Sequence, residues 1–136
     1  MRKALVTGGA GFIGSHMVDL LLSKNYVVRV VDNLITGKTS NLADHINNNN
    51  LHLDNRDIRD LKSNDSIFKD LDYIYHFAGI GDIVPSIDMP EEYMSVNTQG
   101  TVKICEGARH NFVKKLVYAA SSSCYGIANV PTDENA

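Results

Sequence analysis

The sequence has little of several features that mark particular classes of protein. It has only two cysteines, Cys105 and Cys124, which are too few for a disulfide framework, so we expect free thiols in a reducing compartment. No apolar run is long enough to cross a bilayer, and the apolar stretch in "MRKALVTGG" is too short for a signal peptide. The net charge of −3 gives no electrostatic reason for binding nucleic acid or an anionic membrane. We therefore expect a cytoplasmic protein without either partner, and we expect no metal site.

What remains is the composition of an ordinary globular domain. Apolar residues make up 43% of the chain and charged residues 21%, and the 136 residues suffice for one domain with its own hydrophobic core. Short apolar runs alternate with amphipathic stretches, which is typical of parallel β-α-β units. Right-handed crossovers then predict a doubly wound, Rossmann-type α/β sheet in the order 3-2-1-4-5. The predicted strands cover residues 3–7, 26–32, 51–54, 71–79 and 114–121.

The predicted helices differ in strength. The stretch 11–25 is predicted as an amphipathic helix, and a long helix is predicted from about Glu91 to His110. Pro85 and Pro90 predict an open loop before the long helix. Shorter, weaker helices are predicted over 42–46 and 60–69, and loop over 122–136. The buried face of the first helix is predicted to carry Ile13, Met17, Leu20 and Leu21, spaced i, i+4, i+7 and i+8.

A cluster of glycines follows the first predicted strand, in "VTGGAGFIGSH". Four glycines within seven positions need a reason, because glycine loses more backbone entropy on folding than other residues. Between a strand and a helix, this pattern is typical of a dinucleotide-binding turn. Gly8 would take the turn, Gly11 would let a pyrophosphate approach the backbone, and Gly14 would let the helix lie close to the sheet. The helix N-terminus would offer free N–H groups and partial positive charge to the phosphates. The alternative is a loop that only turns the chain.

Asp32 ends the second predicted strand, 18 residues after Gly14. A carboxylate at this point accepts hydrogen bonds from both hydroxyls of an adenosine ribose and repels a 2′-phosphate, so NAD is favoured over NADP. Arg29 and Lys38 are cations that would instead favour a 2′-phosphate. An exposed turn aspartate is the alternative for Asp32.

Five motifs together carry a resemblance to a known family. They are "TGGAGFIGSH", "DNLITGK", "RDIRD", "HFAG" and "AASSSCYG", and they span essentially the whole chain. Their order and spacing resemble those of the extended short-chain dehydrogenase/reductases. The sequence is most similar to the NAD-dependent sugar-nucleotide epimerases and dehydratases of that family, among them the UDP-glucose 4-epimerases. The resemblance implies NAD as the cofactor, a nucleotide-sugar such as a UDP-sugar as the substrate, and a place in polysaccharide biosynthesis.

The resemblance also implies a set of cofactor contacts. Asp57 and Ile58 match the pair that faces adenine, with the Asp57 carboxylate accepting from the exocyclic amine. Asn97, in "YMSVNTQGT", matches a helix asparagine, for which a purely structural hydrogen bond is the equal alternative. The family's pyrophosphate loop is matched by Gly8, Gly11, Phe12, Ile13 and Gly14. Its adenosine-ribose segment is matched by Asp32, Asn33, Gly37 and Lys38. The strand end that lines the cofactor is matched by Phe77, Ala78 and Gly79.

Ser121 is the candidate catalytic hydroxyl. It lies four residues before Tyr125, where the family has a serine or threonine that bonds the sugar oxygen undergoing oxidation. The 4,6-dehydratases of the family carry Asp-Glu directly after that residue, whereas this chain has Ser122 and Ser123, which supply no acid–base catalysis near neutral pH. The resemblance therefore favours a 4-epimerase that oxidises C4 transiently, with a dehydratase or another reductase as the alternative. Tyr125 is expected to be structural, and residues 79–86 are expected to line the sugar-nucleotide side.

The family's catalytic base is absent from the expected pattern. None of the six tyrosines has a lysine four residues later, so the family's Tyr-x-x-x-Lys motif does not occur. We expect residues 1–136 to be the NAD-binding part of a longer enzyme, without its substrate-binding domain and inactive alone. The alternatives are a non-catalytic NAD-binding sensor or interaction module, and a subunit whose missing helix comes from another chain. An unpaired fifth strand would favour a homodimer or higher self-association.

Overall fold

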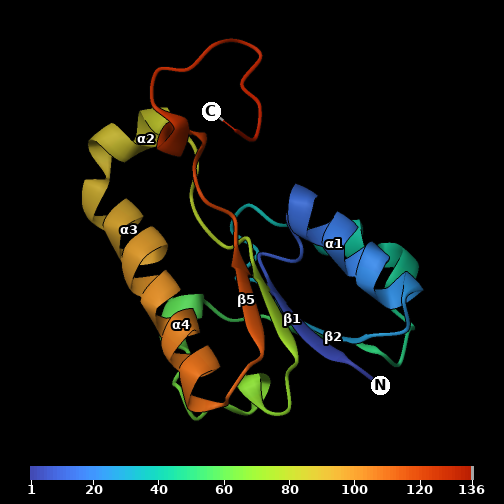
Figure 1. Cartoon of the computed structure of the whole chain (residues 1–136). Helices are drawn as coiled ribbons and strands as arrows, with labels where there is room; N and C mark the ends of the chain where they lie inside the picture. The colour runs from blue at the N-terminus through green and yellow to red at the C-terminus, as the bar shows by residue number, and fades with distance from the viewer. Residues whose placement is uncertain (136) are drawn as a thin grey trace.

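Strands and helices alternate along the chain around one parallel sheet (Figure 1). The computed structural model describes residues 1–135. The strands lie in the order β3-β2-β1-β4-β5, which confirms the predicted Rossmann-type topology. Their bounds are β1 (Lys3–Thr7), β2 (Val27–Val31), β3 (Leu51–Asp54), β4 (Tyr73–His76) and β5 (Lys115–Tyr118).

Helices cover both faces of the sheet. Figure 1 shows α1 (Phe12–Ser23) on one side of the strands and α3 (Pro90–Met94) and α4 (Thr101–His110) on the other. A short helix, α2 (Ile83–Asp88), precedes α3, and a π-helical turn, η4 (Ser95–Gly100), joins α3 to α4. The remaining helical turns are of 3₁₀ type: η1 (Thr39–His45), η2 (Ile58–Asp60), η3 (Ser66–Phe68) and η5 (Ser122–Tyr125).

The alternation of side chains along β1 divides the core into two clusters. Ala4 and Val6 pack with Val18 and other residues of the α1 layer, whereas Leu5 packs with Ile104 of α4 on the opposite face. All of these side chains are fully buried. Burial on both faces explains why β1 contains a continuous apolar run, residues 4–6, in the sequence.

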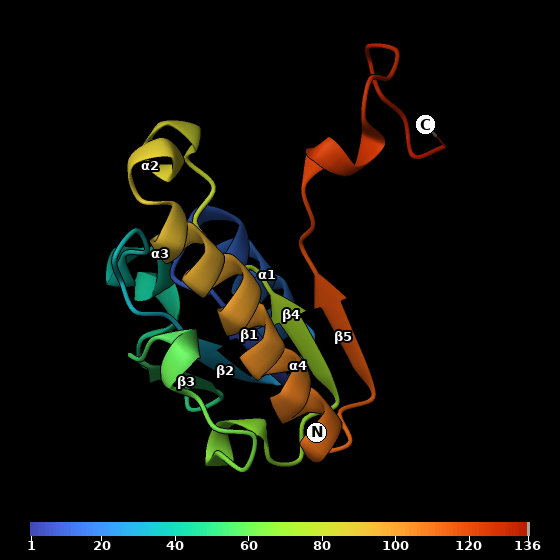
Figure 2. The same cartoon turned by 90° about the vertical axis from the view of Figure 1, so that its left-hand side faces the viewer.

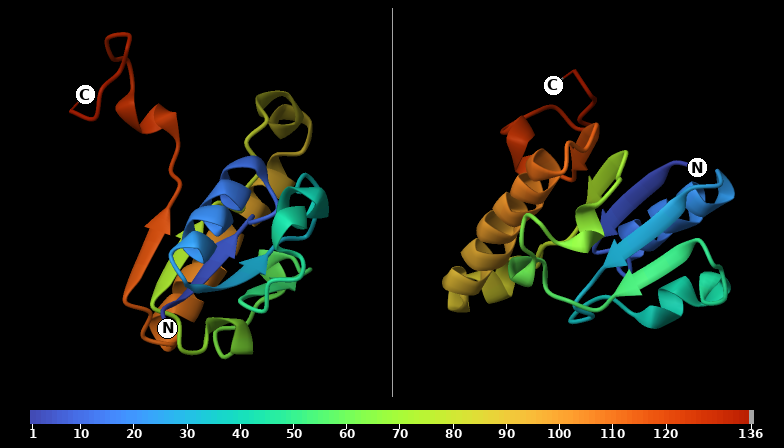
Figure 3. Two further views of the ribbon diagram at one scale, coloured as in Figure 1. Left: turned by 90° about the vertical axis from the view of Figure 1, so that its right-hand side faces the viewer. Right: turned by 90° about the horizontal axis from the view of Figure 1, so that it is seen from below.

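The strand register brings the functional segments to one edge of the sheet. Thr7, the last residue of β1, pairs with Val31 of β2 and with His76 of β4. His76 in turn pairs with Tyr118, the last residue of β5. Because the strands are parallel, the loops that follow them leave the sheet together, as the two views of Figure 3 show. Ligands of doubly wound sheets bind at this carboxyl edge.

The buried face of α1 differs from the prediction. Ile13 is 63% exposed and Leu20 48% exposed, while Leu21 is buried as expected. The buried residues are Gly14, Ser15, Val18, Leu21 and Leu22. Small residues at the start of the helix let its backbone come close to the glycine turn, and this close approach, rather than the largest side chains, determines which face turns inward.

The stretch 79–110 is more helical than predicted. Pro85 lies in the first turn of α2, where the missing N–H has no intrahelical partner to lose, so the loop predicted to stay open contains a short helix. Pro90 begins α3. The predicted long helix exists as three consecutive segments, since the π-helical turn Ser95–Gly100 interrupts its hydrogen-bond pattern.

Several elements are also shorter than predicted. β4 ends at His76 and β5 at Tyr118, so the residues after them belong to loops at the carboxyl edge. The predicted helix 42–46 is part of the 3₁₀ turn Thr39–His45, and the predicted helix 60–69 is replaced by η2 and η3. The predicted loop 122–136 includes the turn η5, and residue 136 lies outside the described residues.

The fifth strand forms one edge of the sheet. Figure 2 shows β5 beside β4 and the chain after it leading away from the other elements. Val117 is 41% exposed and Tyr118 51% exposed, in contrast to the fully buried Ile74 of β4. Within residues 1–135, no helix is both long enough and apolar enough to cross a membrane.

We predict that Gly107→Ala destabilises the protein because α4 packs tightly against Phe68. A Cβ atom at Gly107 would overlap the ring of Phe68, which is fully buried. Such overpacking costs about 1–3 kcal/mol of unfolding free energy, to be measured by urea denaturation. Gly81→Ala is the matched control, because a Cβ there meets nothing within 4 Å. Equal stability of the two variants would contradict the packing described here.

Candidate functional site

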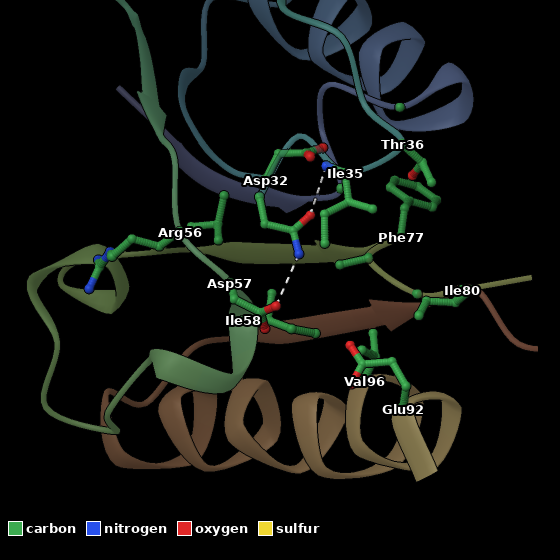
Figure 4. Close-up of a pocket in the computed structure, with 16 residues that line it drawn as sticks. Asp32, Ile35, Thr36, Arg56, Asp57, Ile58, Phe77, Ile80, Glu92 and Val96 are labelled. Atoms are coloured by element: carbon green, nitrogen blue, oxygen red, sulfur yellow. Dashed lines mark hydrogen bonds between the residues drawn. The ribbon is translucent and has the colours of Figure 1, made fainter. Parts of the chain in front are cut away.

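A cavity lies at the carboxyl edge of the sheet, between the glycine turn and η2 (Figure 4). Its walls come from the loops that follow β1, β2, β3 and β4 and from α3 and the turn η4. Nine residues predicted as cofactor contacts line it: Gly8, Gly11, Asp32, Asn33, Asp57, Ile58, Phe77, Ala78 and Gly79.

The glycine turn has the geometry that the sequence predicted at Gly8. Its φ of +67° is a conformation that residues with a side chain rarely adopt, and a Cβ would lie 2.8 Å from the main-chain nitrogen of Ala78. A Cβ on Gly14 would overlap the carbonyl oxygen of Gly8. The close approach of Gly14 is therefore to the turn itself rather than to the strands.

The N-terminus of α1 faces this cavity through its cap, Gly11. No side chain caps the helix, so the N–H groups of its first turn have no side-chain partner. The side chains of Phe12 and Ile13 are 78% and 63% exposed and do not line the cavity. Any contribution of these two residues to an anion site therefore comes from their main-chain N–H groups and the helix dipole.

Asp32 follows β2 and is only 7% exposed. Its Oδ2 accepts a hydrogen bond from Ala10 N at 2.9 Å, and its Oδ1 accepts one from Leu34 N at 2.9 Å. A carboxylate has about four acceptor positions, so each oxygen of Asp32 keeps one for a ligand. Gly37 packs directly against this carboxylate, since a Cβ would lie 2.7 Å from Oδ1.

Asp57 caps η2 and is held by two side chains. Its Oδ1 accepts from the main-chain nitrogen of Arg59 at 2.8 Å and from the Nε of Arg59 at 3.0 Å. Its Oδ2 accepts from Arg59 Nη2 at 2.8 Å and from Asn33 Nδ2 at 3.0 Å. The side-chain hydrogen bonds from Arg59 are the main cause that lowers the pKa of Asp57 to about 2. Arg59 also bonds Glu92 of α3 at 2.9 Å, which connects η2 to the helix across the cavity.

A buried chain of hydrogen bonds runs beneath the cavity through His76, which is fully buried. Thr101 donates its only hydroxyl hydrogen to the Asn97 carbonyl at 2.7 Å, so it must accept from His76 Nε2 at 2.9 Å. Thr7 donates to His76 Nδ1 and accepts from Ala78 N at 3.2 Å. The ring is therefore neutral with its hydrogen on Nε2, and burial lowers its pKa to about 4.

A second hollow adjoins the first and shares its wall of Phe77, Ala78, Gly79 and Ile80. Asn97 and Ser121 both line it. The side chain of Asn97 accepts from Ile80 N at 2.8 Å and donates to Ile80 O at 2.9 Å, so the structural bond expected for this amide exists. Whether Asn97 also contacts a cofactor stays a prediction. Ser121 is exposed, and its Oγ accepts from Ser123 N.

Two cations that favoured NADP lie away from the cavity. Nη1 of Arg29 lies 2.7–3.2 Å from the carbonyl oxygens of Ser66, Ile67 and Lys69, and Arg29 does not line the cavity. Lys38 is exposed and outside the cavity lining, and its main-chain nitrogen donates to Ala10 O at 2.9 Å. Among Arg29, Asp32 and Lys38, Asp32 is consequently the one that lines the cavity.

Sequence reasoning missed two residues that support the cavity without lining it, and several that line it. Arg59 lies in "RDIRD" and was passed over although it holds Asp57, and His76 lies in "HFAG". Glu92, which anchors Arg59, and the two threonines that flank His76 come from distant segments, which a motif does not reveal. The further lining residues are Val31, Ile35, Thr36, Arg56, Ile80, Glu92 and Val96.

Comparisons with known proteins agree with this geometry. The model of the NAD dependent epimerase/dehydratase family matches residues 4–136. A putative UDP-glucose 4-epimerase from Methanocaldococcus jannaschii is 41% identical over 134 residues, which cover 96% of this chain and 42% of that protein. The chain thus spans about two fifths of the length of this curated relative.

Solved structures show the same relation. The UDP-N-acetylglucosamine 4-epimerase of Methanobrevibacter ruminantium M1, solved in complex with UDP-N-acetylmuramic acid, has a TM-score of 0.88 and 36% identity over 98% of this chain and 42% of its own. A UDP-glucose-4-epimerase from Stenotrophomonas maltophila, solved with bound NAD and formylated UDP-arabinopyranose, has a TM-score of 0.86 and 28% identity over 100% of this chain and 42% of its own.

We predict that His76 makes the protein less stable in mild acid. The ordinary histidine pKa of 6.5 applies to the unfolded chain, whereas the folded pKa is about 4. The unfolded state therefore takes up the proton first, so the free energy of unfolding falls as the pH drops from about 6.5 toward 4. The loss amounts to about 2–3 kcal/mol at the lower end and is measured by urea denaturation.

His76→Gln removes this pH dependence, whereas His52→Gln, at an exposed position, leaves it in place. The imidazole ¹⁵N shifts of the unaltered protein give a check that does not require the variant to fold. They are expected to show a neutral ring with hydrogen on Nε2 at pH 5. A ring that is half protonated near pH 6.5 would contradict the buried chain.

Proposed function

The chain belongs to the NAD dependent epimerase/dehydratase family, and we propose that residues 1–136 are the NAD-binding part of a UDP-sugar 4-epimerase. The observation that supports NAD binding is the cavity in which Asp32, the glycine turn and the N-terminus of α1 meet. The choice of epimerase and of a UDP-sugar is supported by relatives of those names, which are up to about 40% identical but more than twice as long.

The residues of the cavity fit a dinucleotide. The turn at Gly8, Gly11 and Gly14 has no room for a Cβ at its first and last positions, and the uncapped N-terminus of α1 suits a pyrophosphate. Asp32 keeps two acceptor positions for the two hydroxyls of a ribose. Asp57 and Ile58 lie across the cavity, where an adenine would be held.

The second hollow is the proposed sugar side. When bound, the nicotinamide supplies a hydride acceptor for oxidation at C4 of the sugar. Ser121 is proposed to hydrogen-bond the sugar oxygen, and its exposed hydroxyl beside Asn97 supports that role. Ser122 and Ser123 offer no acid and base for the elimination of water, which favours epimerisation over dehydration.

The same proposal covers the location, the pathway and the assembly of the protein. We place the enzyme in the cytoplasm, in the supply of nucleotide-sugars for polysaccharides, without a membrane or nucleic-acid partner. The exposed edge of β5 supports self-association as a homodimer or larger assembly.

We predict that the protein binds NAD more tightly than NADP, because a 2′-phosphate would lie against the Asp32 carboxylate. Isothermal titration calorimetry of both dinucleotides tests this. Asp32→Asn is expected to weaken NAD by roughly 10- to 150-fold, the equivalent of a charge-assisted hydrogen bond, and to narrow its advantage over NADP. Asp44→Asn removes the same charge at an exposed position outside the cavity and serves as the control. Tighter binding of NADP would overturn the assignment.

We also predict that the purified 136-residue chain binds NAD without interconverting UDP-glucose and UDP-galactose. The reaction needs a base for the sugar hydroxyl, and a tyrosine of ordinary pKa near 10 is a poor base at pH 7. Tyr93 lines the second hollow, but burial and Asp82 raise its pKa further, and its hydroxyl donates to Asp82 O. Product analysis by NMR after prolonged incubation is the measurement, and turnover above background would contradict the proposal.

A further inference from the structure

The carboxylates of Asp32 and Asp57 face the same cavity but differ in how many acceptor positions remain. Asp32 receives two main-chain donors and keeps two positions. Asp57 receives four donors, two on each oxygen, which fill all four of its positions. A ligand amine can therefore bond Asp57 only by displacing one of these donors.

Three of the four donors belong to Arg59 and are firmly held. One is its main-chain nitrogen at the start of η2, and the other two are a guanidinium fork bound to both oxygens. The same guanidinium is anchored on its far side by Glu92. Displacing any of these would break a charge-assisted pair, so Arg59 stays in place.

Asn33 is the remaining donor, and it differs from Arg59 in exposure, in charge and in the number of bonds that hold it. It is exposed, it is neutral, and its single bond to Oδ2 of Asp57 is 3.0 Å long (dashed at Asp57 in Figure 4). Its own Oδ1 accepts from Ile35 N at 3.2 Å, which turns the amide nitrogen toward Asp57. The amide nitrogen of Asn33 is thus an amine-like donor at the mouth of the proposed adenine subsite.

We propose that Asn33 occupies the acceptor position on Asp57 that the adenine amino group takes, so that cofactor binding exchanges one neutral donor for another. This inference rests on the proposed function. Its consequence is that the amino group adds little net affinity, because the bond it makes replaces one already present. Asn33 is therefore a specificity-determining residue that weakens the preference for an amino-bearing base.

The test compares NAD with its analogue in which purine replaces adenine, so that hydrogen stands in place of the amino group. Calorimetry gives the ratio of the two dissociation constants for each protein. In the unaltered protein this ratio is expected to lie within roughly threefold of one. Asn33→Ser removes the amide donor but keeps a side-chain oxygen for Ile35 N, and the ratio is expected to rise by roughly three- to tenfold.

Asn55→Ser is the control, since Asn55 is an exposed asparagine outside the cavity, and it is expected to leave the ratio unchanged. A purely structural role of Asn33 would weaken both dinucleotides equally and would not move the ratio. NMR adds a measurement on the unaltered protein, in which the Asn33 side-chain amide signals, assigned by their loss in Asn33→Ser, respond differently to the two dinucleotides.

The possible failures are distinguishable. If neither dinucleotide binds, the proposed function falls and the exchange falls with it. A second outcome is that Asp57→Asn and Asn33→Ser both have the same ratio of dissociation constants as the unaltered protein. The amino group is then not bound at Asp57. The exchange is wrong in that case, although NAD binding stands. If only Asp57→Asn changes the ratio, the adenine contact stands and the exchange alone is overturned.

Discussion

The buried ring of His76 connects the two halves of the carboxyl edge. A hydrogen-bond chain passes from Ala78 N through Thr7 to Nδ1, and from Nε2 through Thr101 to the Asn97 carbonyl. Each hydroxyl has one hydrogen, so every step has a fixed direction. Thr7 precedes the glycine turn, and Asn97 holds Ile80. One neutral imidazole thus links the strand that leads into the glycine turn to the helical segment across from it.

The two aspartates of the cavity show why a residue type does not define a role. Asp32 is nearly buried and is met by main-chain N–H groups, which set the loop after β2 and leave acceptor positions free. Asp57 is met by an arginine fork, which keeps it ionised, and its other two acceptor positions are taken by the main-chain nitrogen of Arg59 and by Asn33. In the proposed cofactor complex, a ribose would therefore add bonds at Asp32, whereas an adenine would exchange one at Asp57.

The sheet and the glycine turn were predictable because their causes are local. β1 contains a short apolar run because both of its faces are covered, and β2 is apolar except for Arg29. Gly8 has a φ of +67° that the turn requires. The buried face of α1 was not predictable from hydrophobicity, because close packing on Gly14 selects it. Nor was the bond from Arg59 to Glu92, because it joins residues 33 positions apart in the sequence.

The first cavity is more enclosed than the second hollow, and this difference determines for which of the two the geometry alone indicates a ligand. The first cavity is bounded by the glycine turn, Asp32 and the η2 turn. The hydrogen bonds of Asp32 leave acceptor positions of its carboxylate for a ligand. The second hollow, the proposed sugar side, is bounded by Ser121, which is exposed, and by the end of β5, whose outer edge is unpaired within residues 1–135. Their common wall at Ile80 is held by two hydrogen bonds with the Asn97 side chain. Geometry therefore supports a dinucleotide directly, whereas the identity of the sugar depends on the relatives that share this fold.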